Sequence, residues 1–393
     1  MRVTHLSLAN FRNYARLELD LPPGPVLLVG DNAQGKTNLL EAIYILATTR
    51  SLRASSETEL IRRAVQHDPL AAARIVGVAE RTTGRVQVEV AVARREGAAG
   101  EGGRTLHAAK RLRVNGVPHR AAEVIGRILA VLFTSTDIDL ITGAPAGRRR
   151  YLDITVSQVD HAYLRALQRY SRVLQQRNSL LRQIDEGRAG PDQLAPWDEE
   201  LVAQGSAVVA ARMAAVAELN ANAAALHARL SGGREQLSLT YLPKLGGDPD
   251  QPPDGADLPT LQEHFREGLK RRRPREIAAG LSLIGPHRDD IRFDLDGDPV
   301  ATFGSRAQQR TVALAVRLAE AAYLQARSQD APILLLDDIL SELDERRRAA
   351  VLDTIAEAEQ ALITTADLDR FTGEFLRGAT VYRVADGAVD RFT

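Results

Sequence analysis

The stretch GDNAQGKT, from Gly30 to Thr37, constrains the fold of this chain more than any other feature of its sequence. It follows the short apolar run VLLVG and precedes KTNLLEAIYILATT, whose apolar residues recur at helical spacing. A strand, the pattern G-x-x-x-x-G-K-[ST] and a helix together make a phosphate loop, in which glycines let successive backbone N–H groups face a phosphate. The helix start adds the positive end of its dipole. The sequence therefore predicts an α/β sheet that binds a nucleotide at this loop.

Two side chains of the loop are predicted to do specific chemistry. Lys36 places a compact positive charge on the outer phosphates of the nucleotide, and the Thr37 hydroxyl ligates Mg²⁺. Only four of the 51 lysines and arginines are lysines, so a lysine kept at position 36 indicates a place where a planar guanidinium does not fit. The residues expected to contact the nucleotide here are Gly30, Asp31, Asn32, Ala33, Gln34, Gly35, Lys36, Thr37 and Asn38.

The stretch APILLLDD predicts a second part of the same site. Its apolar residues indicate a buried strand, and in an α/β sheet the carboxyl end of such a strand faces the ligand. We expect Asp337 to hold Mg²⁺ through water and Asp338 to orient or deprotonate the attacking water. Alone, the stretch is more simply a strand ending at a solvated turn, but the phosphate loop in the same chain favours the catalytic interpretation. Because Asp is shorter than the Glu that many ATPases use, Asp338 predicts slow hydrolysis, typical of a switch rather than a motor.

Two further stretches each allow two interpretations. In TFGSRAQQR, Ser305 can cap the helix that follows, with Gln308 as its capping-box partner, or the same residues can contact a ligand. In SELD, Ser341 or Asp344 can cap the next helix, or the stretch can belong to the nucleotide site.

The order of predicted elements indicates one head sheet interrupted by a helical insertion. The expected fold class is α/β, with a mixed sheet that carries the phosphate loop, additional antiparallel strands over 72–115 around a Gly-rich turn at 97–103, and an inserted helical arm lobe. The strand IRFDLDG is expected to return the chain to the α/β part. We expect the head to comprise 1–120 and 281–393, and the arm lobe to comprise 121–280.

The arm lobe is predicted to be an antiparallel helical hairpin. Leu167, Leu174 and Leu181 recur every seven residues in one helical pattern, and a second pattern runs over 197–230. The acidic, Pro-rich stretch 246–259 is expected to be a loop.

Composition excludes several other classes of protein. The chain has no cysteine, which excludes disulfides, thiolate metal sites and thiol nucleophiles. No apolar run reaches the roughly 18 residues of a membrane span, and the N-terminus lacks the pattern of a secretion signal. A cytoplasmic protein is expected. The net charge is zero, so binding of a polyanion would depend on local basic patches.

Several stretches together resemble the RecF family, within the SMC-like DNA repair ATPases whose heads are ATP-binding cassettes. They extend over nearly the whole chain and are LANFRNY (8–14), GDNAQGKTNLLEAIY (30–44), RSLR (50–53), GRRRYLD (147–153), QRN (176–178), GPHRDD (285–290) and LLLDDILSELD (334–344).

The resemblance implies a two-lobed ATPase head with a short arm, two copies of which sandwich two ATP molecules. The Ser305 hydroxyl and the helix start formed by Arg306, Ala307 and Gln308 would then grip the γ-phosphate bound by the other copy, with Asp344 near the interface. The sequence departs from the usual cassette pattern at Ala307, which replaces a glycine. Thr364 or Thr365 stands near the position of a switch histidine, and this again predicts slow turnover.

The resemblance also implies binding to gapped, junction or duplex DNA, a partnership with RecR and help in loading recombinase. Aromatic residues make up only 4% of the chain, which favours contacts to the DNA backbone over base stacking. Each basic cluster can equally be a solvated or ion-paired face. The candidates for phosphate contacts are Arg50, Arg53, Arg62, Arg63, Arg148, Arg149, Arg150, Lys270, Arg271, Arg272 and Arg273.

Two other classes of function compete with a repair ATPase. An SMC-type structural protein that organises DNA is disfavoured because the predicted arm is only tens of residues long. A transporter cassette is disfavoured by the length of 393 residues, the helical insertion and the N-terminal NFRNY stretch.

Overall fold

The structure is a computed structural model that describes residues 1–392 apart from 67, 69, 97–105 and 247–256. The chain divides into two compact units, a sheet unit (Met1–Asp137 and Glu320–Thr393) and a helical unit (Ile138–Ala319). These boundaries differ from the expected ones, since 121–137 belong to the sheet unit and 281–319 to the helical unit. The expected turn at 97–103 and most of the expected loop at 246–259 lie outside the described residues.

The first sheet of the sheet unit is antiparallel and has the strand order β2-β1-β4-β5-β6-β7. Alternating sequences form these strands, as predicted, because one face of each strand packs into the core. Their bounds are β1 Arg2–Phe11, β2 Tyr14–Asp20, β4 Ala72–Arg81, β5 Gly84–Glu96, β6 Leu106–Val114 and β7 Val117–His119.

The second sheet brings the two ends of the chain together in the order β15-β14-β3-β13-β12-β8. Neighbouring strands from β14 to β8 are parallel, and β15 is antiparallel at one edge. The strands are β3 Gly24–Val29, β8 Ala130–Thr134, β12 Ile333–Asp337, β13 Gln360–Thr365, β14 Thr380–Ala385 and β15 Ala388–Arg391. This mixed sheet carries the phosphate loop, which follows β3.

Helix α1 (Lys36–Thr48) packs against strands of both sheets, including β4, β8 and β12. A helix enclosed in this way must be apolar on most of its surface. Leu39, Leu40 and Ile43 are fully buried, as are several of their neighbours on all sides of the helix. The predicted helix is confirmed, and its burial anchors the phosphate loop at a rigid position. Helix α10 (Glu345–Ala356) contacts β3, and α11 (Gly373–Gly378) contacts α10.

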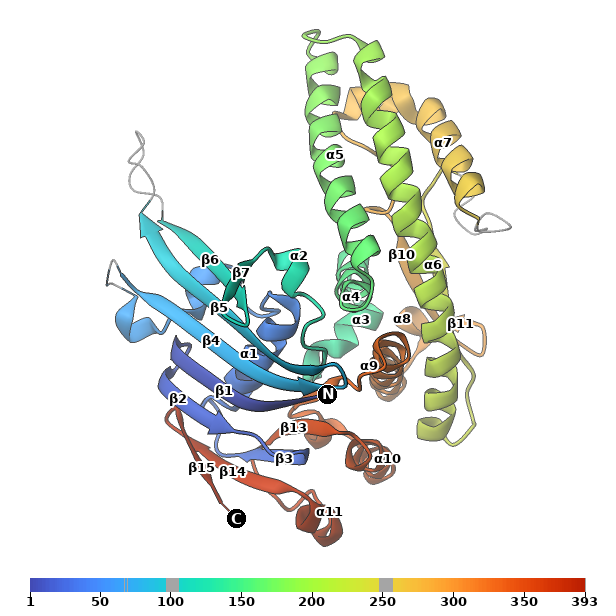
Figure 1. Ribbon diagram of the computed structural model, residues 1–393. Helices are drawn as coiled ribbons and strands as arrows, with labels where there is room; N and C mark the ends of the chain where they lie inside the picture. Colours follow the sequence, from blue (N-terminus) through green and yellow to red (C-terminus); the bar gives the residue numbers. More distant parts are fainter. Residues whose placement is uncertain (67, 69, 97–105, 247–256, 393) are drawn as a thin grey trace. The chain divides into compact units, whose positions relative to one another are not determined.

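The helical unit contains a long antiparallel hairpin of α5 (His161–Asp185) and α6 (Ala195–Ser231), beside which α7 (Leu258–Ala279) packs (Figure 1). The predicted hairpin is confirmed. The predicted leucine seam is only partly correct, because Leu181 is buried whereas Leu167 and Leu174 are half-buried. The buried face of α5 instead runs through Tyr170 and Arg177.

The helical unit also has a small antiparallel sheet with the order β11-β10-β9. The strand predicted from IRFDLDG forms as β10 (Asp290–Leu295), but it pairs with β9 (Leu237–Leu242) and not with the sheet that carries the phosphate loop. This strand was therefore assigned to the wrong part of the molecule. The remaining elements here are α3 Ile138–Thr142, α4 Pro145–Ser157, β11 Asp298–Pro299, α8 Val300–Phe303 and the first part of α9 Arg306–Ser328.

Buried ion pairs hold the helices of this unit together. The fully buried Arg177 donates to Asp198 at 2.7 Å, to Glu276 at 2.6 Å and to Ser282 at 2.7 Å, so that α5, α6 and α7 share one guanidinium. Because each of these groups has a hydrogen-bonding partner, the cost of burying the charges is offset.

A second buried arginine, Arg212 on α6, lies beside the first turn of α5. Arg212 donates to Asp153 at 2.7 Å, to the Tyr163 hydroxyl at 3.0 Å and to the Pro286 carbonyl at 2.7 Å. Asp289 accepts from Tyr241 and from the Lys244 N–H. The stretches GRRRYLD and GPHRDD thus meet in one network.

By length and composition, one helical segment of the described chain, Pro191–Ser231, could cross a membrane. Half of its most apolar part is buried inside the protein, and the ion-paired Arg212 lies on it with 2% of its surface exposed. A buried core helix passes the same test, so this is weak evidence for a membrane span.

Candidate nucleotide site

Two glycines of the loop cannot be replaced without displacing the atoms around them. A Cβ at Gly30 would lie 2.2 Å from the Val384 carbonyl oxygen. Gly35 has a φ of +115°, and a Cβ there would lie 2.5 Å from Asn13 and 2.8 Å from Tyr14. The loop therefore takes its shape because glycine fits both the conformation and the space.

Side chains from the β1–β2 turn hold the loop from one side. Asn13 Nδ2 donates to the Gln34 carbonyl at 2.9 Å, and the Tyr14 hydroxyl donates to the Gly35 carbonyl at 3.1 Å. Asn38 Nδ2 donates to Asn13 Oδ1 at 2.8 Å. Asn13 and Tyr14 were not predicted as site residues, although both lie in the NFRNY stretch that supported the family resemblance.

The Lys36 ammonium folds back onto its own loop, where it donates to the carbonyls of Asp31, at 2.8 Å, and Gly30. Burial lowers the pKa of Lys36 from its ordinary value, while the nearby carboxylates of Asp338, Asp31 and Asp337 act in the opposite direction. The positive charge is thus held among acceptors in the loop that is predicted to receive phosphates.

The carboxyl ends of three parallel strands bring the Mg²⁺ candidates together. Thr37 Oγ1 donates to Asp337 Oδ1 at 2.6 Å, and Thr364 Oγ1 donates to the same oxygen at 2.9 Å. Asp337 and Thr364 pair directly across β12 and β13. Thr37 and Asp337, 300 residues apart in the sequence, therefore meet in one hydrogen bond, and this contact is the centre of the candidate site.

These two oxygen donors suit Mg²⁺, a hard cation that takes one or two protein oxygens and completes its shell with water and phosphate oxygens. Within the described part of the chain, no group of three or more His, Asp or Glu side chains could hold a metal by itself. A cation held by Thr37 and Asp337 would therefore need further oxygens from a nucleotide and water.

Asp338 lies one residue beyond, in a different environment. It has a φ of +53°, in the left-handed region, and its side chain is exposed. Its backbone N–H donates to Thr364 Oγ1 at 3.0 Å. Thr364 thus fixes the backbone of Asp338 and the carboxylate of Asp337 with one hydroxyl. No local sequence pattern predicted these two hydrogen bonds.

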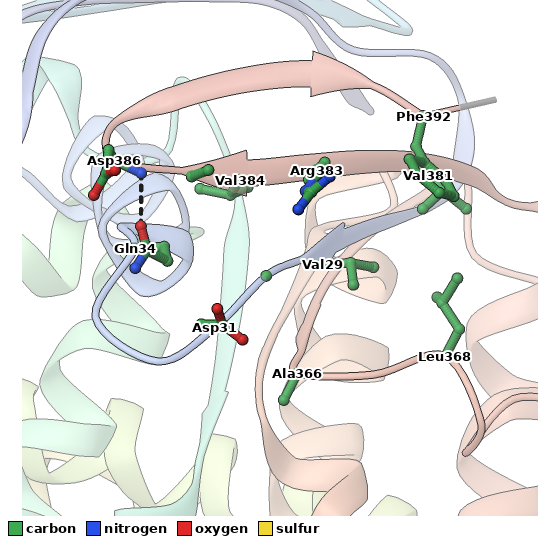
Figure 2. A pocket seen from close by; sticks show the side chains of 12 residues that line it. Val29, Asp31, Gln34, Ala366, Leu368, Val381, Arg383, Val384, Asp386 and Phe392 are labelled. Carbon is green, nitrogen blue, oxygen red and sulfur yellow. Dashed lines mark hydrogen bonds between the residues drawn. The ribbon is translucent and has the colours of Figure 1, made fainter.

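A cavity of about 440 Å³ opens beside the phosphate loop (Figure 2). Its wall is mostly apolar, with Val29, Val381 and Phe392, and its rim carries Asp31 and Asp386. The Asp386 N–H donates to Gln34 Oε1 at 2.6 Å, which ties the β14–β15 turn to the loop. Since Lys36, Thr37 and Asp337 do not line this cavity, it is not the phosphate cradle itself.

The stretch around Ser305 forms the predicted capping box at the start of α9. The Ser305 N–H donates to Gln308 Oε1 at 2.7 Å, and the Gln308 N–H donates to Ser305 Oγ at 3.3 Å. Ser305, Arg306 and Ala307 are exposed. The cap and a ligand-binding role are compatible, because the exposed N–H groups of the first turn still point out of the helix.

Asp344 is the residue that caps α10, because its carboxylate accepts from the Arg347 N–H at 2.9 Å. This hydrogen bond and the charge of Arg347 lower the pKa of Asp344. Ser341 instead donates to the Asp338 carbonyl at 2.7 Å, so it braces the turn after β12.

The basic candidates differ in how far they are buried. Arg148 is buried, and it pairs through two nitrogens with Asp290, at 2.6 and 3.0 Å. It is therefore a structural residue, and its assignment to DNA binding was wrong. Arg149 donates to the Asp289 carbonyl, and Arg273 pairs with Asp198. The exposed candidates are Arg50, Arg53, Arg63, Arg150, Lys270 and Arg271, and the half-buried ones include Arg62 and Arg272.

Comparison with known proteins gives a consistent result. The model of the RecF/RecN/SMC N terminal domain family matches residues 2–386. Two proteins named DNA replication and repair protein RecF resemble the chain over almost all of their length. The one from Chloroflexus aggregans is 45% identical over 395 residues (98% of this chain, 99% of that protein), and the one from Roseiflexus castenholzii is 46% identical over 396 residues (98% and 99%).

Solved structures give the same family. The recombination mediator protein RecF-ATP in the RecFOR pathway has a TM-score of 0.85 and 29% identity, covering 100% of this chain and 97% of that one. An Smc head bound to the C-winged helix domain of ScpA has a TM-score of 0.54 and 16% identity, covering 100% and 97%, which shows a shared fold alone. The predicted fold, an ATP-binding-cassette head with an inserted helical arm, is confirmed.

Proposed function

The chain belongs to the RecF proteins of the RecF/RecN/SMC family, and we propose that it is an ATP-dependent DNA-binding protein of recombinational repair in the cytoplasm. ATP binding would drive two copies to dimerise head to head on gapped or duplex DNA, and slow hydrolysis would reset them. The observation that carries this proposal is the hydrogen bond of 2.6 Å between Thr37 and Asp337, beside the buried ammonium of Lys36. The end of the phosphate loop and the carboxyl end of β12 are thus in direct contact.

The loop residues would bind and orient the triphosphate. The backbone N–H groups after Gly30 and at the start of α1 would face the phosphates, and Lys36 would exchange the carbonyls of Gly30 and Asp31 for phosphate oxygens. The oxygens of Thr37 and Asp337 would hold Mg²⁺, which neutralises charge on the outer phosphates when bound.

The hydrolytic step would depend on Asp338. Its exposed carboxylate, held on a backbone that is fixed by Thr364, would orient an attacking water or accept its proton. The short Asp side chain and the threonines in place of a switch histidine support slow turnover. We therefore propose a switch in which the bound nucleotide, more than the rate of hydrolysis, sets the state of the protein.

Dimerisation would complete the site. Ser305, Arg306, Ala307 and Gln308 present a helix N-terminus, which suits an anion, and in the dimer they would contact the ATP held by the partner's phosphate loop. Asp344 caps a helix that follows β12 and would lie near this interface.

DNA and RecR are the proposed macromolecular partners. The exposed arginines and lysines described above are the candidates for DNA phosphates. The alternative of an SMC-type structural protein with short arms has little support from the arm, since α5 has only 25 residues and is about 37 Å long.

A sedimentation experiment with ATP and gapped duplex tests the proposal. Wild-type protein is expected to dimerise with ATP. Lys36→Arg should lose ATP binding and dimerisation, although the chain otherwise favours arginine, because a planar guanidinium does not fit between the two loop carbonyls. Ser305→Arg should keep ATP binding in the monomer and lose dimerisation. A wild-type protein that stays monomeric with ATP and DNA would contradict the proposal.

A further inference from the structure

One carboxylate joins the start of α9 to the end of α6. Gln308 Nε2 donates to Glu235 Oε1 at 2.8 Å, and His227 Nε2 lies 3.2 Å from Glu235 Oε2. His227 is fully buried in the last turns of α6, and 24% of the Glu235 side chain is exposed. All three residues belong to the helical unit. The roles proposed for the phosphate loop and for β12, which lie in the sheet unit, do not explain these contacts.

Glu235 determines which way the Gln308 amide points. The amide oxygen accepts from the Ser305 N–H at 2.7 Å, and the amide nitrogen donates to Glu235. A carboxylate can only accept, and a backbone N–H can only donate, so only one of the two orientations of the amide satisfies both neighbours. Glu235 therefore holds the amide oxygen toward Ser305 and closes the capping box.

The carboxylate is itself held on a rigid support. Glu235 follows Gly232, which ends α6 in the left-handed conformation, and precedes β9. The next residue, Gln236, donates its N–H to Asp296 Oδ1 at 2.9 Å and accepts from the Asp296 N–H at 3.0 Å, at the end of the β9–β10 pair. The position of Glu235 is thus fixed by α6 through His227 and by the small sheet through Gln236.

A negatively charged residue is unexpected beside the N-terminus of α9. A negative side chain within one hydrogen bond of a helix N-terminus that receives phosphate weakens the attraction for that phosphate. A residue selected only for binding ATP would not carry this charge. The geometry instead favours orientation, since a charged acceptor holds the Gln308 amide more firmly than a neutral one does.

We propose that Glu235 is a positioning residue for ATP-driven dimerisation, which orients Gln308 and Ser305 toward the ATP of the partner and is itself held by His227. This inference rests on the function proposed above. It assigns to the α6–β9 junction a role in the nucleotide interface, although that junction contains no part of the phosphate loop or of the Ser305 stretch.

Glu235→Ala, Glu235→Gln and Glu235→Lys test the proposal, with hydrogen exchange of the Ser305 and Gln308 amides in ATP-free protein and sedimentation with ATP. Glu235→Ala should speed exchange at both amides and weaken dimerisation roughly tenfold, the size of one lost hydrogen bond to a charged group. Glu235→Gln should restore both, because its amide oxygen can accept from Gln308. Glu235→Lys should be at least as weak as Glu235→Ala. ATP binding by the monomer should not change.

Glu199→Ala is the matched control, since Glu199 is an exposed carboxylate on α6, far in sequence from Glu235, that pairs with Arg266. It removes the same charge and should leave exchange and dimerisation unchanged. A Glu235→Ala protein that dimerises like wild type, or that weakens without faster exchange at 305 and 308, would overturn the inference. A wild-type protein that does not dimerise with ATP would instead refute the proposed function.

Discussion

Thr364 controls two groups of the candidate site through one buried hydroxyl. Its Oγ1 donates to the Asp337 carboxylate at 2.9 Å and accepts from the Asp338 N–H at 3.0 Å. A hydroxyl can do both at once, whereas a methyl group of the same size can do neither. The site therefore depends on a buried residue that lies outside the phosphate loop.

Thr364→Val should lower the rate of ATP hydrolysis roughly tenfold or more, while ATP binding changes less. The partly buried Asp338 N–H loses its acceptor, which costs about 1 kcal/mol, and the Asp338 side chain shifts relative to the water that it orients. Single-turnover hydrolysis and equilibrium ATP binding separate the two effects. Thr365→Val is the control, because Thr365 is equally buried but donates to the Asp367 carbonyl. Equal losses in both variants would contradict this role for Thr364.

Asp338→Asn should trap the ATP-bound dimer. Asn tolerates the left-handed conformation that residue 338 adopts, so the fold is expected to persist, while the amide cannot accept a proton. We expect hydrolysis to fall by about a hundredfold or more and the dimer to outlast that of the wild type. Dimer lifetime after removal of free ATP provides the measurement. A variant that turns over at the parental rate would exclude Asp338 as the base.

At the scale of elements, local sequence patterns predicted α1, β12, α9 and the α5–α6 hairpin, because each has a period or a flanking motif of its own. They misassigned β10, since the choice between two sheets depends on its partner β9, which lies about fifty residues earlier in the sequence. The burial of Arg177 was equally invisible, because its carboxylate partners stand at 198 and 276. For the same reason the sequence indicated Asp337 but not its hydrogen bond with Thr364, which depends on strand pairing.

The loop over 285–290 contains two buried groups with opposite dependence on pH. Burial lowers the pKa of His287 to about 4, and burial raises the pKa of Asp289 to about 6. Between about pH 4 and 6.5 the unfolded chain binds a proton at His287 that the folded protein does not, so this residue makes the folded state more stable as pH rises. Between about pH 4 and 6 the folded protein keeps a proton on Asp289, which makes the folded state less stable as pH rises.

His287→Asn should therefore change the slope of stability against pH. The free energy of unfolding of the wild type minus that of the variant should increase from about pH 4 to 6.5, and groups common to both proteins cancel in this difference. For Asp289→Asn, the same difference should decrease from about pH 4 to 6. Fluorescence of the single tryptophan, Trp197, reports on the helical unit because it packs against the cluster around Leu181. Parallel curves for all three proteins would contradict the assignment.

At the scale of the whole molecule, the stretches that identify the family divide into two kinds. The phosphate loop and LLLDDILSELD form the candidate site in the sheet unit. GRRRYLD, QRN and GPHRDD instead supply the buried network of the helical unit, through Arg148, Arg177 and Asp289. Because Arg148, Arg177 and Arg212 pair with carboxylates inside the helical unit, these arginines do not add to the basic surface that DNA could contact.

Arg50 and Arg53 are the strongest remaining DNA candidates in the sheet unit, because both are exposed beside α1. If each contacts a phosphate, replacing both by alanine should weaken binding to duplex DNA and reduce the slope of log affinity against log salt by about 1.8, or 0.9 for each contact. Fluorescence anisotropy with ATP at several salt concentrations measures the slope. ATP binding is measured in parallel, because Arg53 Nη1 donates to Asn38 Oδ1 at 3.5 Å and Asn38 is a candidate nucleotide contact.

The control removes the same charge elsewhere on the sheet unit, at Arg16 and Arg85, which are both exposed. A change in net charge alone would weaken binding equally in the two double variants, whereas direct contacts would change the slope only for Arg50 and Arg53. An unchanged slope in that variant would exclude the 50–53 segment as a phosphate contact. The same measurement on a variant without Lys270 and Arg271 would then test whether α7 takes that role, because these two exposed side chains are candidates of the helical unit.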